Sequence, residues 1–427
     1  MKKTLYSLSL GLACFASVSA SAQTSLRAAL PTLGQQPEVT KGRPCATMDV
    51  LNAQLAADPA MATRMASIEA QTNRFLANGV AQRTAATVSI PVVVHVLYNT
   101  SAQNVSDAQV QSQINVLNQD YAKLNADINK VPAAFSGLAA NTNIQFVLAK
   151  RTPTGAATTG IIHKSTKVSS WSTNDAVKNS KRGGDDAWDT SKYLNIWVCN
   201  LGQGLLGYAQ FPGGTASTDG VVILYSSLPG GSSVPYDKGR TATHEVGHWL
   251  NLRHIWGDAN CGNDLVSDTP TQQTSNYGCP SFPHVTCSNG SNGDMFMNYM
   301  DYTDDACMYM FTTGQSSRMN ALFATGGARA SLLTSNGATA PLVATATTME
   351  SMKLYPNPAT DQISIRTAMD TPASNWTAKV YDLRGFEMKQ ARTSDNGTLD
   401  VTNLPAGYYQ VVLTDGVNVQ HQRFQKQ

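Results

Sequence analysis

The chain is poor in charge, in cysteine and in histidine. Of its 427 residues only 14% are charged, and 31 Lys and Arg against 29 Asp and Glu leave a net charge of +2. Such a balance gives no indication of a nucleic-acid partner or of an acidic surface as partner. Seven cysteines and seven histidines are so few that any clustering among them is informative.

Long apolar runs are also missing beyond the first residues, so we expect no membrane span. Two early lysines, an apolar stretch from Leu5 to Ala20 and a small-x-small site at Ala20–Ala22 predict a signal peptide over residues 1–22. Cys14 would suit a lipoprotein, but it lies inside the apolar core of that peptide. We therefore expect an exported, secreted protein, and the sequence does not decide whether it stays attached to the cell surface.

Three of the scarce histidines lie together, at His244, His248 and His254. Residues i and i+4 of a helix share one face, so His244 and His248 can bind one zinc ion. Glu245 follows, where its carboxylate can reach a water held by that ion. His254 would lie roughly 9 Å further along a straight helix, so the helix must end near Asn251 and turn back there in a left-handed conformation. Three ligands leave one position open, as in a catalytic zinc site.

The stretch from His244 to His254 (HEVGHWLNLRH) resembles the signature of the metzincin metallopeptidases, and Asn298–Tyr302 (NYMDY) resembles their Met-turn. Together the two are most similar to the pappalysin family. The resemblance covers roughly residues 88–330 and departs from the usual pattern at Asn251, where Gly is usual, and at Arg253, where an aromatic residue is expected. It implies an α+β, metzincin-like catalytic domain with a twisted mixed sheet, an active-site helix and a loop-rich lower subdomain.

By resemblance, the protein is a secreted zinc-dependent endopeptidase, made as a latent zymogen, that hydrolyses peptide bonds in protein or peptide substrates. Glu245 is then the general base, Tyr302 donates a hydrogen bond to the oxyanion, and Met300 lies beneath the zinc. The alternative is a secreted binding protein with an inactive metzincin domain. The presence of the glutamate, the three histidines and Tyr302 favours the enzyme, and the Met-turn disfavours a hydrolase of non-peptide bonds.

The preference for the residue after the cleaved bond is not determined by the sequence. Some pappalysins cut before basic residues, which requires an acidic group in the pocket beyond the zinc. Asp304 and Asp305 lie near that position, but Ala306 directly precedes Cys307. A basic preference would be lost if the acidic residue of the family belongs at position 306.

Residues 23–85 combine helical spacing of apolar residues with few strand signals, which predicts a propeptide. Cys45 is its notable residue, because a thiolate can occupy the open position of a zinc ion and exclude water. A buried or unpaired thiol is the alternative, and the sequence supports both equally. The sequence does not determine where the propeptide is cleaved; Arg83, just before the first strand, and Arg74 are available positions.

The catalytic domain is expected over residues 86–335. Apolar runs predict strands, and Ser106 can cap a helix whose apolar face is formed by Val110, Ile114, Leu117 and Tyr121. His95, inside the first strand, is expected to be a packed residue, and Cys199 a buried thiol. The predicted strands are Ser89–Tyr98, Ile144–Ala149, Tyr193–Cys199 and Val221–Tyr225.

The segment 255–297 and the residues just after the Met-turn carry four cysteines in a loop-rich stretch, which predicts two disulfides in an exported protein. A cysteine-ligated zinc site is the alternative, but no close C-x-x-C pair is present. Resemblance to pappalysins favours Cys261–Cys287 and Cys279–Cys307. It also implies a calcium ion in the same loop, where Asp264, Asp268 and Thr269 supply oxygens; turn-forming carboxylates are the alternative.

Residues 336–350 form a small-residue linker, and residues 351–427 predict a small β-sandwich of short alternating strands. Leu354–Ala359 (LYPNPA) and Leu404–Leu413 (LPAGYYQVVL) resemble the C-terminal sorting domain of proteins exported by the type IX secretion system. The resemblance implies that this machinery is a partner. A carbohydrate- or protein-binding module is the alternative.

Overall fold

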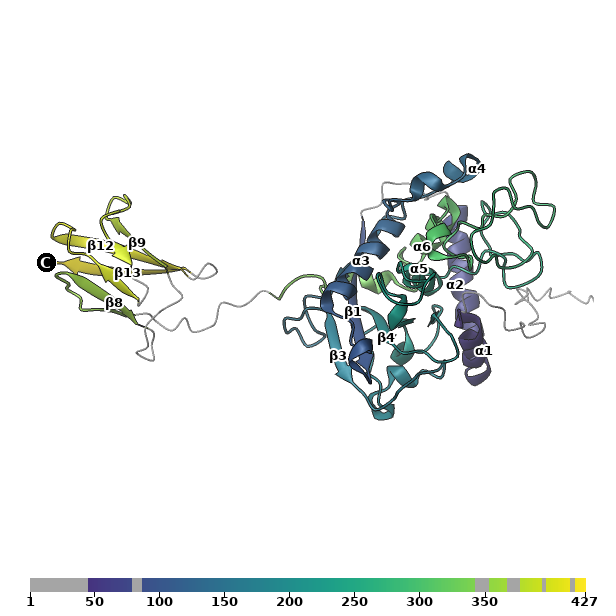
Figure 1. Cartoon of the computed structure of the whole chain (residues 1–427), viewed down its shortest axis with the longest axis horizontal. Coiled ribbons are helices and arrows are strands. Elements are labelled where there is room, and N and C mark those ends of the chain that lie inside the picture. The colour runs from purple at the N-terminus through teal and green to yellow at the C-terminus, as the bar shows by residue number, and fades with distance from the viewer. Residues whose placement is uncertain (1–44, 79–86, 342–352, 367–376, 394–396, 415–418) are drawn as a thin grey trace, which may run out of the picture. The chain divides into compact units, whose positions relative to one another are not determined.

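The computed structural model describes residues 45–78, 87–341, 353–366, 377–393, 397–414 and 419–427. The chain divides into two compact units, Met1–Thr339 and Ala340–Gln427, and each is described by itself (Figure 1). The predicted signal peptide, the start of the propeptide, the available cleavage position at Arg83 and most of the linker lie outside the described residues. No helix in the described ranges is long and apolar enough to cross a membrane.

The first unit is built on a mixed sheet whose centre is β1 (Val88–Tyr98). On one edge, β1 pairs in parallel with β2 (Ile144–Leu148) along its first half and with β3 (Ile161–Ser165) along its second. Its other edge pairs with β4 (Leu194–Cys199), followed by β6 (Val221–Leu224) and the antiparallel β5 (Gly207–Ala209). This is the mixed sheet that was expected. The sequence analysis did not predict β3, which is half exposed, or β5, which is only three residues long.

Both faces of β1 are covered, which explains why its sequence is apolar without alternation. Val92, Val94 and Val96 belong to the large core cluster on the side of the helices, whereas Leu97 belongs to a second cluster with Trp197. His95 is fully buried, as predicted, with its ring stacked on Trp197. Polar partners satisfy both of its nitrogens: Nδ1 lies 2.7 Å from Asp185 and Nε2 3.1 Å from Asn195.

Two helices complete the large core. Helix α3 (Asp107–Tyr121) begins at Ser106, whose side chain accepts a hydrogen bond from Gln109 N and so confirms the predicted cap. The apolar face predicted for α3 is buried in that cluster, and α5 (Arg240–Trp249) packs against α3. The remaining α-helices are α1 (Thr47–Ala57), α2 (Ala60–Ala77), α4 (Ala133–Ser136) and α6 (Thr313–Ala321).

Helices α1 and α2 follow one another along one side of the unit, and α2 lies against α6 (Figure 1). Their apolar residues Leu51 and Met61 pack on Phe211, just beyond β5. Short 3₁₀ turns join the elements of this unit at Ser101–Gln103, Ile128–Lys130, Ala176–Lys178, Ser180–Arg182, Ala216–Thr218, Tyr225–Ser227, Asp305–Cys307 and Ala330–Thr334. The helical stretch that the sequence predicted within residues 23–85 is therefore present, and it packs on the rest of the first unit.

The second unit contains two antiparallel sheets, in the orders β10-β11-β8-β7 and β13-β12-β9. Ile363 and Leu399 from the first sheet and Val380, Val411 and Phe424 from the second share one core, so the unit is the expected β-sandwich. Its strands are β7 (Lys353–Tyr355), β8 (Gln362–Arg366), β9 (Thr377–Asp382), β10 (Arg392–Thr393), β11 (Thr398–Asp400), β12 (Gly407–Thr414) and β13 (Val419–Lys426).

A buried carboxylate joins α3 and α5 to the chain around the Met-turn. Asp120 of α3 accepts hydrogen bonds from Thr243 Oγ1 (2.7 Å) and from the Tyr299 hydroxyl (3.0 Å). Arg240 Nε lies 2.9 Å from Asp120 Oδ2, but it is not aligned for a hydrogen bond, so charge attraction dominates that contact. Burial raises the pKa of Asp120 to about 6, even though Arg240 opposes the shift. Three segments far apart in sequence thus meet at one group.

We expect Asp120→Ala to lower the free energy of unfolding by about 3–5 kcal/mol, because Arg240 and two hydroxyl donors would lose a buried partner. Urea denaturation of the full chain measures the change. The control is Asp107→Ala on the same helix, whose side chain is 63% exposed in its pair with His163 and should cost less than about 1 kcal/mol. Equal losses for the two variants would contradict the structural role given to Asp120.

Candidate metal centre

Helix α5 and the turn after it bring three imidazoles to one point. His244 and His248 lie one turn apart on α5, and Asn251 has a φ of +69°, the left-handed conformation that the sequence predicted there. The chain therefore reverses and returns His254 to the helix. His248 Nε2 lies 3.1 Å from His244 Nε2 and 3.0 Å from His254 Nε2.

The outer nitrogen of each imidazole has an oxygen partner. His244 Nδ1 donates to the Tyr299 carbonyl at 2.7 Å and His248 Nδ1 to the Leu252 carbonyl at 2.8 Å. Because a carbonyl oxygen only accepts, these two rings carry their proton on Nδ1. His254 Nδ1 lies 2.5 Å from the Asp258 carboxylate, which imposes the same tautomer.

These tautomers direct three Nε2 lone pairs at one another. Lone pairs about 3 Å apart in a buried site repel unless a cation lies between them, and neutral imidazole nitrogens are preferred zinc ligands. The three histidines are at most 1% exposed, and burial, together with the neighbouring His254, lowers the pKa of His248. The residues therefore fit a zinc ion with protein ligands His244, His248 and His254.

The Met-turn packs directly beneath α5. Met300 is fully buried, and a Cβ atom added at Gly247 would lie 2.5 Å from its sulfur, so only glycine allows this approach. The same loop holds Tyr302, whose hydroxyl lies 3.0 Å from His254 Nε2. Burial raises the pKa of Tyr302 well above its ordinary value, so the phenol keeps its proton and can donate a hydrogen bond.

The candidate base Glu245 is buried between α5 and β5. A Cβ atom at Gly207 would lie 2.9 Å from its side chain, which shows how closely this edge strand approaches. Its Oε2 accepts a hydrogen bond from the Thr47 hydroxyl at 2.8 Å and lies 3.4 Å from the Cys45 sulfur. Thr47 was not predicted as a site residue, because nothing near it in sequence indicates a partner 198 residues away.

Cys45 completes a fourfold donor set. Its sulfur and one ring nitrogen from each of the three histidines all lie within 4.8 Å of one another. Among the described residues this is the one group of three or more His, Cys, Asp or Glu side chains that could hold a metal ion. The sequence left Cys45 open between a metal ligand and an unpaired thiol, and the structure places its sulfur beside the histidines.

The residues around Cys45 occupy the outer edge of β5. Cys45 forms a parallel bridge with Gly207, and Ala46 N donates to the Gly207 carbonyl at 3.1 Å. Thr47 Oγ1 accepts a hydrogen bond from Ala209 N at 2.8 Å, and the Tyr302 hydroxyl donates to the Cys45 carbonyl at 3.4 Å. A short segment before α1 therefore contacts the histidine cluster, the base, the edge strand and Tyr302 at once.

Asp305, one of the two acidic residues considered for substrate preference, has a structural role. Asp305 is fully buried and accepts hydrogen bonds from Lys238 N (2.8 Å) and Arg240 N (3.2 Å). It thus satisfies backbone donors at the start of α5, where Gly239 has no side chain to serve as a cap. Because Asp305 supports the start of α5, it gives no support for a preference for basic residues after the cleaved bond.

The loop-rich stretch 250–304 holds neither strand nor α-helix, as expected for the lower subdomain. Two disulfides brace it, Cys261–Cys287 and Cys279–Cys307, in the pairing that the family resemblance implied. Their Cα–Cα distances are 5.8 and 5.6 Å, within the ordinary range for a disulfide. The second disulfide ties the loop to the chain that follows the Met-turn. Cys199 is the buried free thiol expected in β4.

The three predicted calcium residues lie in two different contacts. The Thr269 hydroxyl is 3.0 Å from both carboxylate oxygens of Asp264 and from the Val266 carbonyl. Burial raises the pKa of Asp264 to about 6. The Asp268 carboxylate instead accepts from Thr312 Oγ1 (2.7 Å) and Gly314 N (2.8 Å), at the start of α6.

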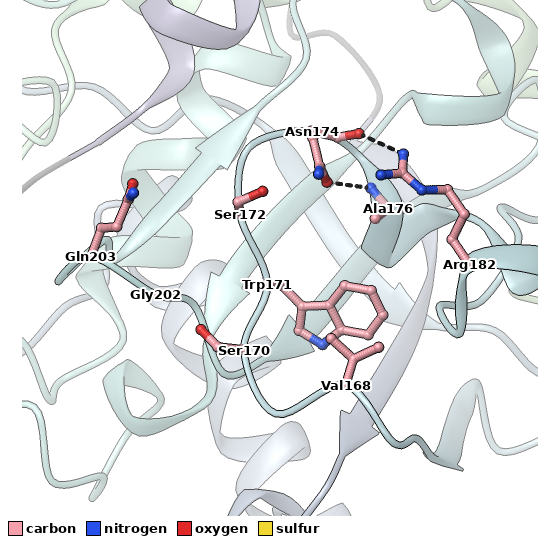
Figure 2. Close-up of a pocket in the computed structure, with 9 residues that line it drawn as sticks. All are labelled: Val168, Ser170, Trp171, Ser172, Asn174, Ala176, Arg182, Gly202 and Gln203. Carbon is pink, nitrogen blue, oxygen red and sulfur yellow. Dashed lines mark hydrogen bonds between the residues drawn. The ribbon is translucent and has the colours of Figure 1, made fainter.

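An open pocket of about 380 Å³ lies apart from these groups, between the loop after β3 and the turn before β5 (Figure 2). It contains neither carboxylate, histidine nor cysteine, so it offers no metal ligands. Arg182 reaches across it to the Asn174 carbonyl at 3.2 Å. It is lined by Val168, Ser170, Trp171, Ser172, Asn174, Ala176, Arg182, Gly202 and Gln203.

Known proteins resemble both units. Residues 177–324 match the family described as Pregnancy-associated plasma protein-A, and residues 353–427 match the Secretion system C-terminal sorting domain. The extracellular metalloprotease of Pyricularia oryzae is 36% identical over 257 residues, which cover 58% of this chain and 79% of that protein. The extracellular metalloprotease of Arthroderma otae is 34% identical over 242 residues, covering 54% of this chain and 76% of that protein.

Solved structures of similar proteins lead to the same family. Mature mirolysin of Tannerella forsythia in complex with a cleaved peptide is 56% identical, with a TM-score of 0.58, covering 58% of this chain and 97% of that one. A promirolysin mutant from the same organism is 50% identical, with a TM-score of 0.63, covering 68% and 97%. These relatives favour the enzyme over an inactive binding protein, and the proenzyme supports a zymogen. The chain thus belongs to the pappalysin family and is an extracellular zinc metalloendopeptidase made in a latent form.

Proposed function

We propose that His244, His248 and His254 hold the catalytic zinc ion, that Glu245 is the general base and that Tyr302 stabilises the oxyanion. The observation that carries this proposal is the convergence of three Nε2 atoms whose rings are oriented by hydrogen bonds at Nδ1. When bound, zinc supplies Lewis-acid chemistry: it lowers the pKa of a water and polarises the scissile carbonyl.

The residues of the chain then divide the proton and charge transfers between them. The Glu245 carboxylate accepts the proton of the attacking water and returns it to the amine that leaves. Tyr302, kept protonated by its burial, donates a hydrogen bond to the oxygen that becomes negative. Met300 takes no part in proton transfer; it supports the helix that carries two of the histidines.

The role of Glu245 can be tested in the mature chain, from which the propeptide has been removed. We expect Glu245→Gln to lower kcat on a peptide substrate by about 10²–10⁴-fold, because the amide cannot accept the proton of water. Metal analysis should find that the variant retains zinc, since Glu245 is not among the proposed ligands. Full activity in the variant would show that another group is the base, and loss of zinc would contradict the assignment of the ligands.

We attribute latency to Cys45, just before α1, and to Thr47, the first residue of α1. The proposed switch is Cys45, whose thiolate would occupy the fourth position of the metal and exclude water. Thr47 adds a second restraint, because its hydroxyl holds the carboxylate that must receive a proton, at 2.8 Å. Cys45 would block the open position of the metal, and Thr47 would keep the Glu245 carboxylate from accepting a proton.

Two substitutions separate these restraints. In the uncleaved chain, we expect Cys45→Ser to permit slow peptide cleavage and Thr47→Val alone to remain inactive, because its metal position stays blocked. The double variant should exceed Cys45→Ser by roughly tenfold or more, since a hydrogen bond to a charged group contributes about 1.5–3 kcal/mol. Cleavage of a fluorogenic peptide measures the rates, and mass spectrometry verifies that the chain is intact. A double variant no faster than Cys45→Ser would exclude the restraint by Thr47.

A calcium ion is proposed at Asp264 and Thr269, with the Val266 carbonyl as a further ligand. Asp264 provides a buried carboxylate, and both of its oxygens and the Val266 carbonyl oxygen lie 3.0 Å from the Thr269 hydroxyl. Oxygen ligands on irregular backbone suit calcium. Asp268 remains a predicted ligand, although its carboxylate already binds the start of α6.

Calcium should raise the melting temperature of the chain, and Asp264→Asn should abolish the rise. Because the pKa of Asp264 without metal is about 6, calcium must displace a proton below that pH, so the rise should be smaller at about pH 5 than at about pH 7.5. Differential scanning calorimetry with and without calcium measures both effects. Asp268→Asn tests separately whether this residue contributes to calcium binding. A rise that persists in Asp264→Asn would place the ion elsewhere.

The type IX secretion machinery is the proposed partner of the second unit. Its sequence matches a secretion sorting domain over residues 353–427, and its β-sandwich core is closed and separate from the catalytic core. Export of the full chain, compared with a chain that ends at residue 341, tests this assignment in a cell that carries the machinery. Equal export of both chains would contradict it.

A further inference from the structure

Propeptide helix α2 contacts the catalytic unit through one carboxylate. Glu69 forms a two-point ion pair with Arg318 of α6, with its oxygens 2.9 Å from Nη1 and 2.8 Å from Nη2. The Arg318 side chain is only 2% exposed, whereas that of Glu69 is 26% exposed. Such parallel hydrogen bonds are the geometry in which arginine recognises a carboxylate.

Arg318 is positioned by the catalytic unit itself. Its Nη1 also donates to the Leu265 carbonyl at 3.2 Å, and it projects from a helix that begins with a complete capping box at Thr312 and Gln315. Neither contact involves the propeptide. Arg318 therefore keeps these two supports when α2 is absent.

A second guanidinium lies beside this pair. Arg253, one of the two residues at which the sequence departs from the family pattern, makes no hydrogen bond or close ion pair with the described residues. Burial disfavours the charged form of Glu69, but the hydrogen bond from Arg318 and the charges of Arg318 and Arg253 hold the pKa of Glu69 below its usual value. Two cations thus act on this propeptide carboxylate, while Asp258 and Asp264 of the catalytic unit also attract Arg253.

Cleavage of the propeptide would remove Glu69 and leave Arg318 and Arg253 in the catalytic unit. Both available cleavage positions, Arg74 and Arg83, follow Glu69 in the chain, so the released segment carries Glu69 with it. Arg253 immediately precedes the zinc ligand His254, so its Cα lies about 3.8 Å from that of the ligand. Arg253 therefore belongs to the chain segment that carries a proposed zinc ligand.

We propose that in the mature enzyme Arg318 and Arg253 bind the carboxylate of an Asp or Glu side chain of the polypeptide substrate, at the place that Glu69 occupies in the zymogen. This inference rests on the proposed function and adds a determinant of specificity to it. The site would favour substrates that carry an acidic residue at a distance from the cleaved bond. Raising the ionic strength should weaken this selection once the site is open to solvent.

The test incubates the mature chain, from which the propeptide has been removed, with a mixed peptide library. The new peptide ends are then sequenced. We expect Asp and Glu to be enriched on one side of the cleaved bonds, a few residues away, and the enrichment to disappear in Arg253→Gln and in Arg318→Gln. The control is Arg182→Gln, because Arg182 lies at the separate pocket of Figure 2 and should leave the enrichment unchanged.

A matched pair of peptides measures the size of this preference for an acidic residue. The two differ only by Glu or Gln at the enriched position, and wild type should cleave the Glu peptide with a roughly tenfold higher kcat/KM, mainly through KM, as expected for a charged hydrogen bond. In Arg253→Gln the ratio should fall toward one. Arg253→Gln decides the question alone if thermal melting shows that Arg318→Gln is misfolded.

The outcomes are distinct. A wild type that cleaves peptides without acidic enrichment, or variants that keep the enrichment, would overturn this inference and leave the proposed function intact. A wild type that cleaves no peptide, despite verified removal of the propeptide, would overturn both.

Discussion

The structure depends on three imidazole nitrogens being held about 3 Å apart in a buried site. Their lone pairs repel unless a cation lies between them, and every ring is oriented from behind, by the Tyr299 carbonyl, the Leu252 carbonyl and the Asp258 carboxylate. These acceptors come from the Met-turn, the turn after α5 and the loop that follows. The metal centre is therefore a property of the lower loops as much as of the helix that carries the motif.

Those loops need supports, which the rest of the unit provides. Asp120 ties α3 to both α5 and Tyr299. Asp305 accepts hydrogen bonds from the backbone just before and at the first residue of α5, and the Cys279–Cys307 disulfide braces the chain after the Met-turn. Gly247 lets the methionine sulfur approach the helix backbone. Each support joins segments distant in sequence, so the geometry is cooperative: loss of one support would shift more than one ligand.

The sequence predicted the parts of this site that depend on local spacing. The positions of His244, His248 and His254, and the left-handed turn at Asn251, follow from the geometry of a helix and the reach of a metal–nitrogen bond. It did not predict Thr47 against the base, or α2 against α6, because those contacts depend on how a separate segment folds back over the sheet edge. Strand β5 was missed for a related reason: three residues carry no periodic signal, and their pairing creates the edge.

The central claim is that the latent chain surrounds its metal with three imidazoles and the Cys45 sulfur. The most direct test replaces zinc with cobalt in the uncleaved chain and records the absorption spectrum, because a thiolate bound to cobalt gives a charge-transfer band that imidazole does not. We predict this band in the wild type, its absence in Cys45→Ser, and its loss when the propeptide is removed. A latent wild-type chain that binds cobalt without the band would contradict the account.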